Sequence, residues 1–336
     1  MRLTTSSNTS ESARITSTPD PLRVAIWAAG LIVAVIAAAL RPDASAAAAR
    51  ATAGPFATLA AIILAAALAD RLGAFRIMAR ALIPARGRTT SVAAVLAFTA
   101  LLSALVNLDV AVVVAMPVAL RVAQRQSLSA GRLAVAVAIT ANAASFLLPT
   151  SNITNLLLLG RMPLTTPAYI SDSWLPWTLV TAVTLAPLAA WAAHAAPGQA
   201  RAIAARPSAR AVRDLVPMFL LASGIRGLLG TGLALHGSFT SQLTQATVLA
   251  CAASNLPAAA ALLPAGTQGL WAAILATTVG PNLLITGSVA TLITRRIARD
   301  GGATLTAWQL SATGLALVPA QLAAATLGLH ILGVLT

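Results

Sequence analysis

The sequence predicts an all-α polytopic membrane protein of two inverted repeats, each carrying a re-entrant hairpin and a discontinuous transmembrane helix. Three observations lead to this fold class. The 336 residues are 58% hydrophobic and 9% charged, with a mean hydropathy of +0.85, which is more apolar surface than a soluble core absorbs. Apolar runs long enough to span a membrane alternate with arginine clusters. Polar residues interrupt the middle of four of these runs.

The composition excludes several other classes. All 22 basic residues are arginine, in short clusters between apolar runs, which indicates membrane loops and no nucleic-acid surface. The single cysteine, Cys251, excludes a disulfide framework and a thiol metal cluster. His194, His236 and His330 are scattered and lack acidic partners at ligand spacing. No nucleotide, dinucleotide or nucleophile motif is present, so we expect no metal, no cofactor and no enzymatic activity.

The expected elements follow the apolar runs. Residues 1–21 are rich in Ser and Thr and predict a disordered cytoplasmic tail. Repeat 1 (22–195) is expected to contain scaffold helices at 22–40 and 55–72, a hairpin at 91–120, a broken helix at 133–160 and a helix at 174–195. After an arginine-rich cytoplasmic linker at 196–213, repeat 2 (214–336) is expected to contain a scaffold helix at 214–235, a hairpin at 240–264, a broken helix at 269–294 and a helix at 306–334.

The residues after the first run, 41–46, fit a signal-peptide cleavage site as well as a loop. We favour a retained helix at 22–40, and both interpretations leave residue 50 outside.

Arginine positions set the predicted orientation. Eighteen arginines fall on one side of the expected spans, and only Arg41, Arg50 and Arg161 lie clearly opposite. Because cytoplasmic loops are enriched in arginine, this bias predicts a multi-pass protein of the bacterial inner membrane, with a cytoplasmic N-terminus and an external C-terminus. Arg226 lies inside a span, where an interface anchor is the favoured interpretation over a functional charge.

The run at 91–120 has arginine clusters at both ends, so both ends are expected on the cytoplasmic side. Its thirty residues are too few for two crossings of about 20 residues each. We therefore expect a re-entrant hairpin that turns at Asn107-Leu108-Asp109. The run at 240–264 turns at Ser254-Asn255-Leu256-Pro257 and is expected to enter from the outside.

Each hairpin is followed by a run with polar residues in its middle. Aligning residues 147–151 with 283–287 gives a repeat offset of 136 residues. Proline, glycine and small polar residues at these points predict discontinuous helices, and paired breaks in two inverted halves point to a midplane binding site. The expected breakers are Pro149, Pro257, Gly280, Pro281 and Gly287. The candidate substrate- or ion-binding residues are Asn107, Thr150, Ser151, Asn152, Asn155, Asn255, Asn282, Thr286 and Ser288. Hairpin turn formation and repair of the broken helices are the alternative roles for these residues.

Asp109 is the candidate proton-coupling residue. An acid that gains and loses a proton at a hairpin tip inside the membrane can link substrate movement to proton movement. The alternative is a helix N-cap, since Asp favours that position. The two roles are compatible.

At these residues the chain resembles bacterial arsenite-efflux permeases, the arsenical-pump membrane protein family of the ion transporter superfamily. Sodium-coupled dicarboxylate symporters belong to the same superfamily. The matching stretches are Ser103–Asp109, Leu148–Asn155, Ser254–Pro257 and Gly280–Ser288. The resemblance implies an elevator-type transport domain of hairpins and broken helices that moves against a scaffold. The chain is shorter than that pattern, with one scaffold span before the second hairpin where the first has two.

Secondary transport is therefore the expected function, with proton-driven efflux of arsenite or antimonite as the favoured activity. The inventory of Asn, Ser and Thr suits a neutral polyhydroxy solute, and an ionised Asp109 would repel an anion. A sodium/proton antiporter and a sodium-coupled dicarboxylate or sulfate symporter are the alternatives, and an intramembrane enzyme is the alternative from another class. Expected partners are membrane lipid and a small inorganic solute or ion. A homodimer and a cytoplasmic ATPase on the arginine-rich loops are left open.

Overall fold

The computed structural model describes residues 21–81, 87–160, 162, 164–194, 210–213, 215–229 and 232–335. Most of the expected tail and of the 196–213 linker lies outside the described residues. The described part is almost entirely helical. Four of its helices are long and apolar enough to cross a membrane, namely Pro42–Arg71, Arg88–Leu105, Thr166–Ala193 and Ala307–Ile331.

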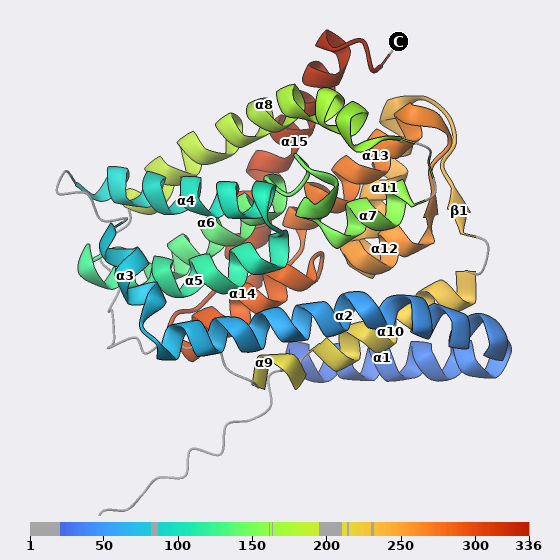
Figure 1. The fold of residues 1–336 in the computed structure, drawn as a ribbon, viewed down its shortest axis with the longest axis horizontal. Coiled ribbons are helices and arrows are strands. Elements are labelled where there is room, and N and C mark those ends of the chain that lie inside the picture. The colour runs from blue at the N-terminus through green and yellow to red at the C-terminus, as the bar shows by residue number, and fades with distance from the viewer. Residues whose placement is uncertain are drawn as a thin grey trace, which may run out of the picture.

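Three helices form a layer along one side of the molecule: α1 (Pro21–Leu40), α2 (Pro42–Arg71) and α10 (Leu215–Leu229) (Figure 1). Glycines allow α1 and α10 to approach closely. A Cβ atom at Gly30 would lie 2.5 Å from the Pro217 carbonyl oxygen, and one at Gly224 would lie 2.9 Å from Val33. We call α1, α2 and α10 the three-helix layer. The short helix α3 (Ala74–Ala81) follows α2 along the chain, and α9 (Arg210–Arg213) precedes α10.

The start of α2 differs from the expected helix at 55–72. The helix begins at Pro42, immediately after α1, because the alanine-rich stretch from 44 to 54 is compatible with helix and Pro42 occupies the first helical turn. The residues that fit a cleavage site, 41–46, therefore lie at the start of a 30-residue helix rather than in a loop.

The first hairpin consists of α4 (Arg88–Leu105) and α5 (Leu108–Arg125), which pack side by side and turn at Val106 and Asn107 (Figure 1). The expected turn at 107–109 thus lies at the start of α5. The expected bounds of the hairpin, 91–120, were too narrow. Each of its two helices has 18 residues and is about 27 Å long. Both helices continue into the flanking arginine-containing segments, which the hydropathy pattern had excluded.

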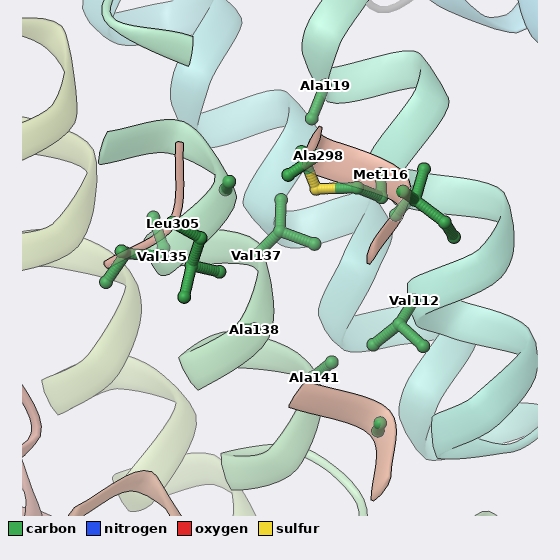
Figure 2. Close-up of a cluster of buried hydrophobic side chains, with 14 of the residues drawn as sticks. Val112, Met116, Ala119, Val135, Val137, Ala138, Ala141, Ala298 and Leu305 are labelled. Carbon is green, nitrogen blue, oxygen red and sulfur yellow. The ribbon is translucent and has the colours of Figure 1, made fainter. Parts of the chain in front are cut away.

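A hydrophobic core joins the first hairpin to the broken helices. Val112, Met116 and Ala119 of α5 face residues of α6 (Ala130–Ala143), together with Ala298 and Leu305 (Figure 2). The α6 residues in this cluster are Val135, Val137, Ala138 and Ala141. Four of these nine side chains are alanine, and small residues at helix contacts are typical of membrane helix packing.

Both expected broken helices are interrupted. After α6 the chain forms a single 3₁₀ turn, η1 (Pro149–Ser151), and then the short helix α7 (Ile153–Leu159). In the second half, α13 (Gly266–Thr278) is followed by the 3₁₀ turn η2 (Gly280–Leu283) and by α14 (Val289–Asp300). The first segment starts at Ala130 rather than 133, and the second runs from Gly266 to Asp300 rather than over 269–294.

The second hairpin is shorter than the first. Its helices are α11 (Phe239–Ala253) and α12 (Asn255–Ala261). Two-residue strands, β1 (Leu233–Ala234) and β2 (Leu262–Leu263), pair in parallel before and after it. The expected all-α class is therefore wrong in this detail, and the expected helix at 214–235 ends at Leu229. Glycine at 232, with φ of +92°, precedes the β1 strand.

The last helices of the two halves pack against each other on the side opposite the three-helix layer (Figure 1). These are α8 (Thr166–Ala193) and α15 (Ala307–Ile331), expected at 174–195 and 306–334. A buried hydrogen bond joins them, with Gln321 Nε2 donating to Thr184 Oγ1 at 2.8 Å. Helix α8 starts earlier than expected because Thr165 caps it by accepting a hydrogen bond from the Ala168 amide.

Candidate functional site

Four helices begin around one small cavity. Its lining residues come from the first turns of α5, α7, α12 and α14 and from the middle of α2: Asp109, Ile153, Asn255, Leu256, Val289, Ala290 and Phe56. Both hairpin turns and both helix breaks therefore meet here. The cavity volume is about 20 Å³, which holds about one water molecule.

The repeat offset reappears in the lining of the cavity. Ile153 and Val289 both line it and lie 136 residues apart. Ile153 is the first residue of α7 and Val289 is the first residue of α14. The residues just before them, Asn152 and Ser288, have nearly the same backbone angles, with φ of −148° and −139°. Corresponding positions of the two halves thus contribute to the same site. The alignment contained this signal, although the apolar lining residues were not among the sequence candidates.

Asp109 lies in the first turn of α5 and is only 6% exposed. Within the described part of the chain, its carboxylate has no hydrogen-bond or ion-pair partner. None of the described residues that line the cavity is an arginine. Asn107, two residues earlier, caps α5 instead: its Oδ1 accepts a hydrogen bond from the Asp109 amide at 2.8 Å. The carboxylate is therefore not used to cap its own helix.

Asn107 also connects the first hairpin to the first break. Its Nδ2 donates to the Thr150 carbonyl oxygen at 3.1 Å. Both residues line a wider groove of about 380 Å³, next to Thr58 of α2 and residues of α7. Ile153 belongs to both this groove and the small cavity. The groove reaches the size of ordinary ligand pockets.

The second hairpin is tied to the second break in a similar way. The Gly287 carbonyl oxygen accepts hydrogen bonds from the Asn255 amide at 2.7 Å and from Ser254 Oγ at 3.3 Å. Gly287 lies 137 residues after Thr150, so each break fixes a hairpin turn through a carbonyl at nearly equivalent positions. Asn255 Oδ1 accepts from the Leu256 amide at 2.9 Å, and the side chain also lines the cavity.

Several candidates in the first break repair the backbone there. Asn155 Nδ2 donates to the Ser145 carbonyl oxygen at 3.0 Å, and Asn152 Nδ2 donates to Ser145 Oγ at 3.1 Å. Asn152 Oδ1 caps α7 by accepting from the Thr154 amide, and Ser151 Oγ donates to the Leu148 carbonyl oxygen at 2.6 Å. These residues are buried and do not line the cavity. These donor groups bond within the segment from Ser145 to Asn155 that contains the first break.

The remaining candidates of the second break lie in different surroundings. Asn282 lies between the two halves, where its Oδ1 accepts from Asn142 Nδ2 at 3.1 Å. Ser288 is fully buried, and its hydroxyl has no partner among the described residues. Thr286 is half-buried and lines neither the cavity nor the groove. Of the breakers, Pro149, Gly280 and Pro281 lie in the 3₁₀ turns, Gly287 precedes α14, and Pro257 lies within the first turn of α12.

A family model described as a citrate transporter (CitMHS) matches residues 15–332. No curated protein matches the chain. The match identifies a multi-pass secondary transporter of the ion transporter superfamily and not an enzyme. It does not identify an arsenite permease specifically. The motifs behind that resemblance form the two hairpin turns and the two helix breaks of the structure.

Proposed function

This chain is a member of the citrate transporter family, and we propose that it moves a citrate-like polycarboxylate across the membrane with Asp109 as the proton-coupling group. The observation that carries the proposal is the position of Asp109. Its buried carboxylate faces the cavity around which four helices begin. Proton coupling, the polycarboxylate and the roles of individual residues are our inference.

Helix starts favour an anion at this site. The N-terminal end of an α-helix carries partial positive charge and unpaired amide groups. Helix α5 with 18 residues and α14 with 12 residues both begin at the cavity. Carboxylates of a substrate therefore find favourable electrostatics here although none of the described lining residues is an arginine. The expectation from sequence was that an ionised Asp109 would repel an anion, and the proposal meets it by binding the substrate together with a proton on Asp109.

Asp109 then provides the coupling. An ionised carboxylate next to a polycarboxylate is repelled, and the repulsion is stronger in a site with few water molecules. Protonation of Asp109 removes that repulsion, so the loaded site holds substrate and proton together. Release of the proton on the other side favours release of the substrate. The expected direction of coupling is symport.

Conformational change is required for substrate entry. A cavity of about 20 Å³ does not admit a molecule of the size of citrate. We propose that the hairpins and broken helices form a transport domain that moves relative to the three-helix layer, in an elevator-type cycle of two inverted repeats covering 22–195 and 214–336. Equivalent lining residues from the two halves support this arrangement. Both hairpins are proposed to be re-entrant, with both turns at the cavity.

Asn107, Thr150 and Asn255 are the side chains that we propose contact the substrate, since they line the cavity or the adjoining groove. Ser288 is proposed to offer its buried hydroxyl to substrate or cation. Ser151, Asn152, Asn155 and Asn282 are assigned to the support of the broken helices.

The test is transport by the purified full-length chain in proteoliposomes. Labelled citrate uptake is measured under an imposed pH gradient, an imposed sodium gradient, or neither, for the native chain, for Asp109→Asn and for Asp43→Asn. Asp43 is an exposed residue at the start of α2 and provides the matched control. We expect accumulation driven by the pH gradient in the native and control chains. Asp109→Asn should lose accumulation yet retain citrate counterflow, because exchange needs no net proton movement.

Each part of the proposal has its own contradicting result. Absence of citrate transport, with arsenite transported instead, would reject the polycarboxylate and restore the arsenite interpretation. Accumulation driven by sodium alone would reject proton coupling. Native accumulation by Asp109→Asn would remove Asp109 from that role.

A further inference from the structure

Helix α8 presents a row of hydrogen-bond donors to the first break. Tyr169, Ser173 and Trp177 are spaced four residues apart and therefore lie along one face of the helix. Each side chain donates to a backbone carbonyl oxygen between α6 and α7, at 2.8 or 2.9 Å: Tyr169 to Phe146, Ser173 to Leu147 and Trp177 to Ala144. We call these three side chains the α8 donors. Neither the sequence candidates nor the proposed transport cycle includes them.

The first break needs donors because its carbonyl groups have left the helix. Helix α6 ends at Ala143 and α7 begins at Ile153, so the carbonyl oxygens between them lack regular helical partners. Each carbonyl oxygen from residue 144 to residue 148 accepts a hydrogen bond from a side chain. Ser151 and Asn155 serve two of these oxygens from within the same segment. The α8 donors serve the other three, so they hold this backbone from a separate helix.

The supported backbone leads directly to the coupling residue. Thr150 lies two residues after the last of these carbonyl groups, and its own carbonyl oxygen accepts from Asn107 Nδ2 at 3.1 Å. Asn107 Oδ1 in turn accepts from the Asp109 amide at 2.8 Å. A shift of the first break would therefore move the hairpin turn that carries Asp109.

The α8 donors are themselves held in place. Tyr169 and Ser173 are fully buried, and the Tyr169 ring lies against Trp271 of α13 with centroids 5.0 Å apart. Helix α15 also contacts α8 closely, since a Cβ atom at Gly328 would lie 2.7 Å from the Pro176 nitrogen. Donors on a helix that is packed in this way give the bonded backbone one well-defined position.

The second break meets its neighbouring long helix in a different way. Helix α15 approaches it through a glycine, because a Cβ atom at Gly314 would overlap the Asn282 carbonyl oxygen. The contact is one of close packing between backbones. Side-chain donors from a neighbouring long helix thus distinguish the first break, which is the one joined to Asp109.

We propose that the α8 donors are positioning residues for the substrate site. By fixing the carbonyl oxygens of the first break, they hold Thr150 and Asn107 in the arrangement that binds substrate beside Asp109. Loss of one donor leaves a carbonyl oxygen without its partner, so the break spends time in other arrangements. The apparent affinity falls with the fraction of binding-competent molecules, and saturating substrate restores that arrangement. The inference rests on the proposed transport of a polycarboxylate.

The first arm of the test is citrate transport by the purified full-length chain in proteoliposomes under a pH gradient. The variants are Tyr169→Phe, Ser173→Ala and Trp177→Phe. The matched controls lie on the same helix but do not reach the break. They are Thr178→Val, whose hydroxyl bonds within α8 to the Trp174 carbonyl oxygen at 2.7 Å, and Trp174→Phe, whose side chain is 49% exposed.

Each variant should raise the KM for citrate about fivefold, while the maximal rate per folded molecule stays close to the native value. Both controls should keep the native KM. A role in folding alone would lower the amount of active protein and leave the KM unchanged. That result in all three variants would overturn the proposal.

The second arm does not depend on the solute. Hydrogen–deuterium exchange of the same proteins in detergent reports local opening of the backbone. Tyr169→Phe and Ser173→Ala should raise exchange in residues 144–152 and at the Asp109 amide, and leave residues 280–288 at the native level. Native exchange at the start of α5 in both variants would overturn the positioning role. If the native chain transports no citrate, the proposed function fails, and this arm still decides whether the α8 donors position the hairpin turn.

Discussion

At the residue scale, three of the acids in the described helices differ in their hydrogen-bond and ion-pair partners. Asp70 pairs with Arg121, and Asp172 accepts a hydrogen bond from Trp271 Nε1 at 3.4 Å. Asp109 is buried, has no such partner within the described residues and faces a cavity. A buried acid without a partner is unfavourable, which supports the proposed role of Asp109 as the proton-coupling group.

Ser254 carries backbone strain at the second hairpin turn. Its φ of 72° and ψ of 155° belong to a region that is nearly restricted to glycine, at a cost of about 1–3 kcal/mol. Its hydroxyl donates to the Gly287 carbonyl oxygen at 3.3 Å.

We predict opposite behaviour for two substitutions of Ser254. Ser254→Gly relieves the strain of about 1–3 kcal/mol and loses the same hydrogen bond, worth about 1 kcal/mol, so it should maintain or raise the stability. Ser254→Ala keeps the strain and loses the hydrogen bond, so it should lower stability by about 1 kcal/mol. Thermal unfolding in detergent measures both, and equal stability of the two variants would contradict the strain argument.

At the element scale, the two hairpins differ in length. The first has two helices of 18 residues, and the second has helices of 15 and 7 residues. The shorter second hairpin ends in the β1–β2 pair instead of a longer helix. The repeats therefore share their turns and breaks but not the lengths of the arms.

Close packing of α1 on α10 gives a prediction for the three-helix layer. Gly30→Ala should destabilise the protein by about 1–3 kcal/mol, because the added Cβ would lie 2.5 Å from the Pro217 carbonyl oxygen. Gly54→Ala on α2 is the matched control, with no atom within 4 Å of its Cβ position. Gly54→Ala should stabilise by up to about 1 kcal/mol through helix propensity. Melting temperatures in detergent distinguish the two; similar losses at both sites would contradict the packing argument.

The pair Asp70–Arg121 links α2 to the far end of α5. Asp70 has a side chain that is 3% exposed, so Asp70→Asn should destabilise the protein by about 3 kcal/mol by leaving the arginine without its counter-charge. The exchanged pair Asp70→Arg with Arg121→Asp should recover part of this loss. Unfolding measurements on the single and double variants give the coupling energy, and purely additive effects would show that the pair contributes nothing.

At the scale of the whole molecule, the three-helix layer and the hairpins meet at the cavity and its groove. Phe56 of α2 contacts Phe219 of α10 within the layer, with ring centroids 5.6 Å apart, and also lines the cavity. An elevator-type cycle requires this boundary to slide.

Cross-linking across the boundary should therefore stop transport. In a Cys251→Ser background, cysteines are placed at Thr58 of α2 and Leu157 of α7, which both line the groove of about 380 Å³. A reducible bifunctional reagent should abolish citrate accumulation, and reduction should restore it. Cysteines at Ser45 and Ser223, which line a groove within the three-helix layer, provide the control pair. Full transport by the cross-linked Thr58–Leu157 pair would argue against relative movement.

The sequence by itself determined the membrane class, the order of spans, the two turns at Asn107 and Asn255 and both polar breaks. These features depend on local properties: hydropathy over a span, arginine between spans, and proline, glycine or asparagine where a helix must stop. Local properties do not determine the solute. An asparagine such as Asn152 or Asn155 looks the same in the sequence whether it binds a ligand or hydrogen-bonds an interrupted backbone.

Only the tertiary structure decided which candidates share a cavity. It brings Asp109 and Asn255 together although they lie 146 residues apart, and it places Asn282 on Asn142 instead. It also identified Phe56, Ile153 and Val289, whose apolar side chains carry no functional signal in sequence. Convergence of four helix starts on one cavity is a long-range packing result that no local sequence pattern contains, and it is the basis for proposing an anionic substrate.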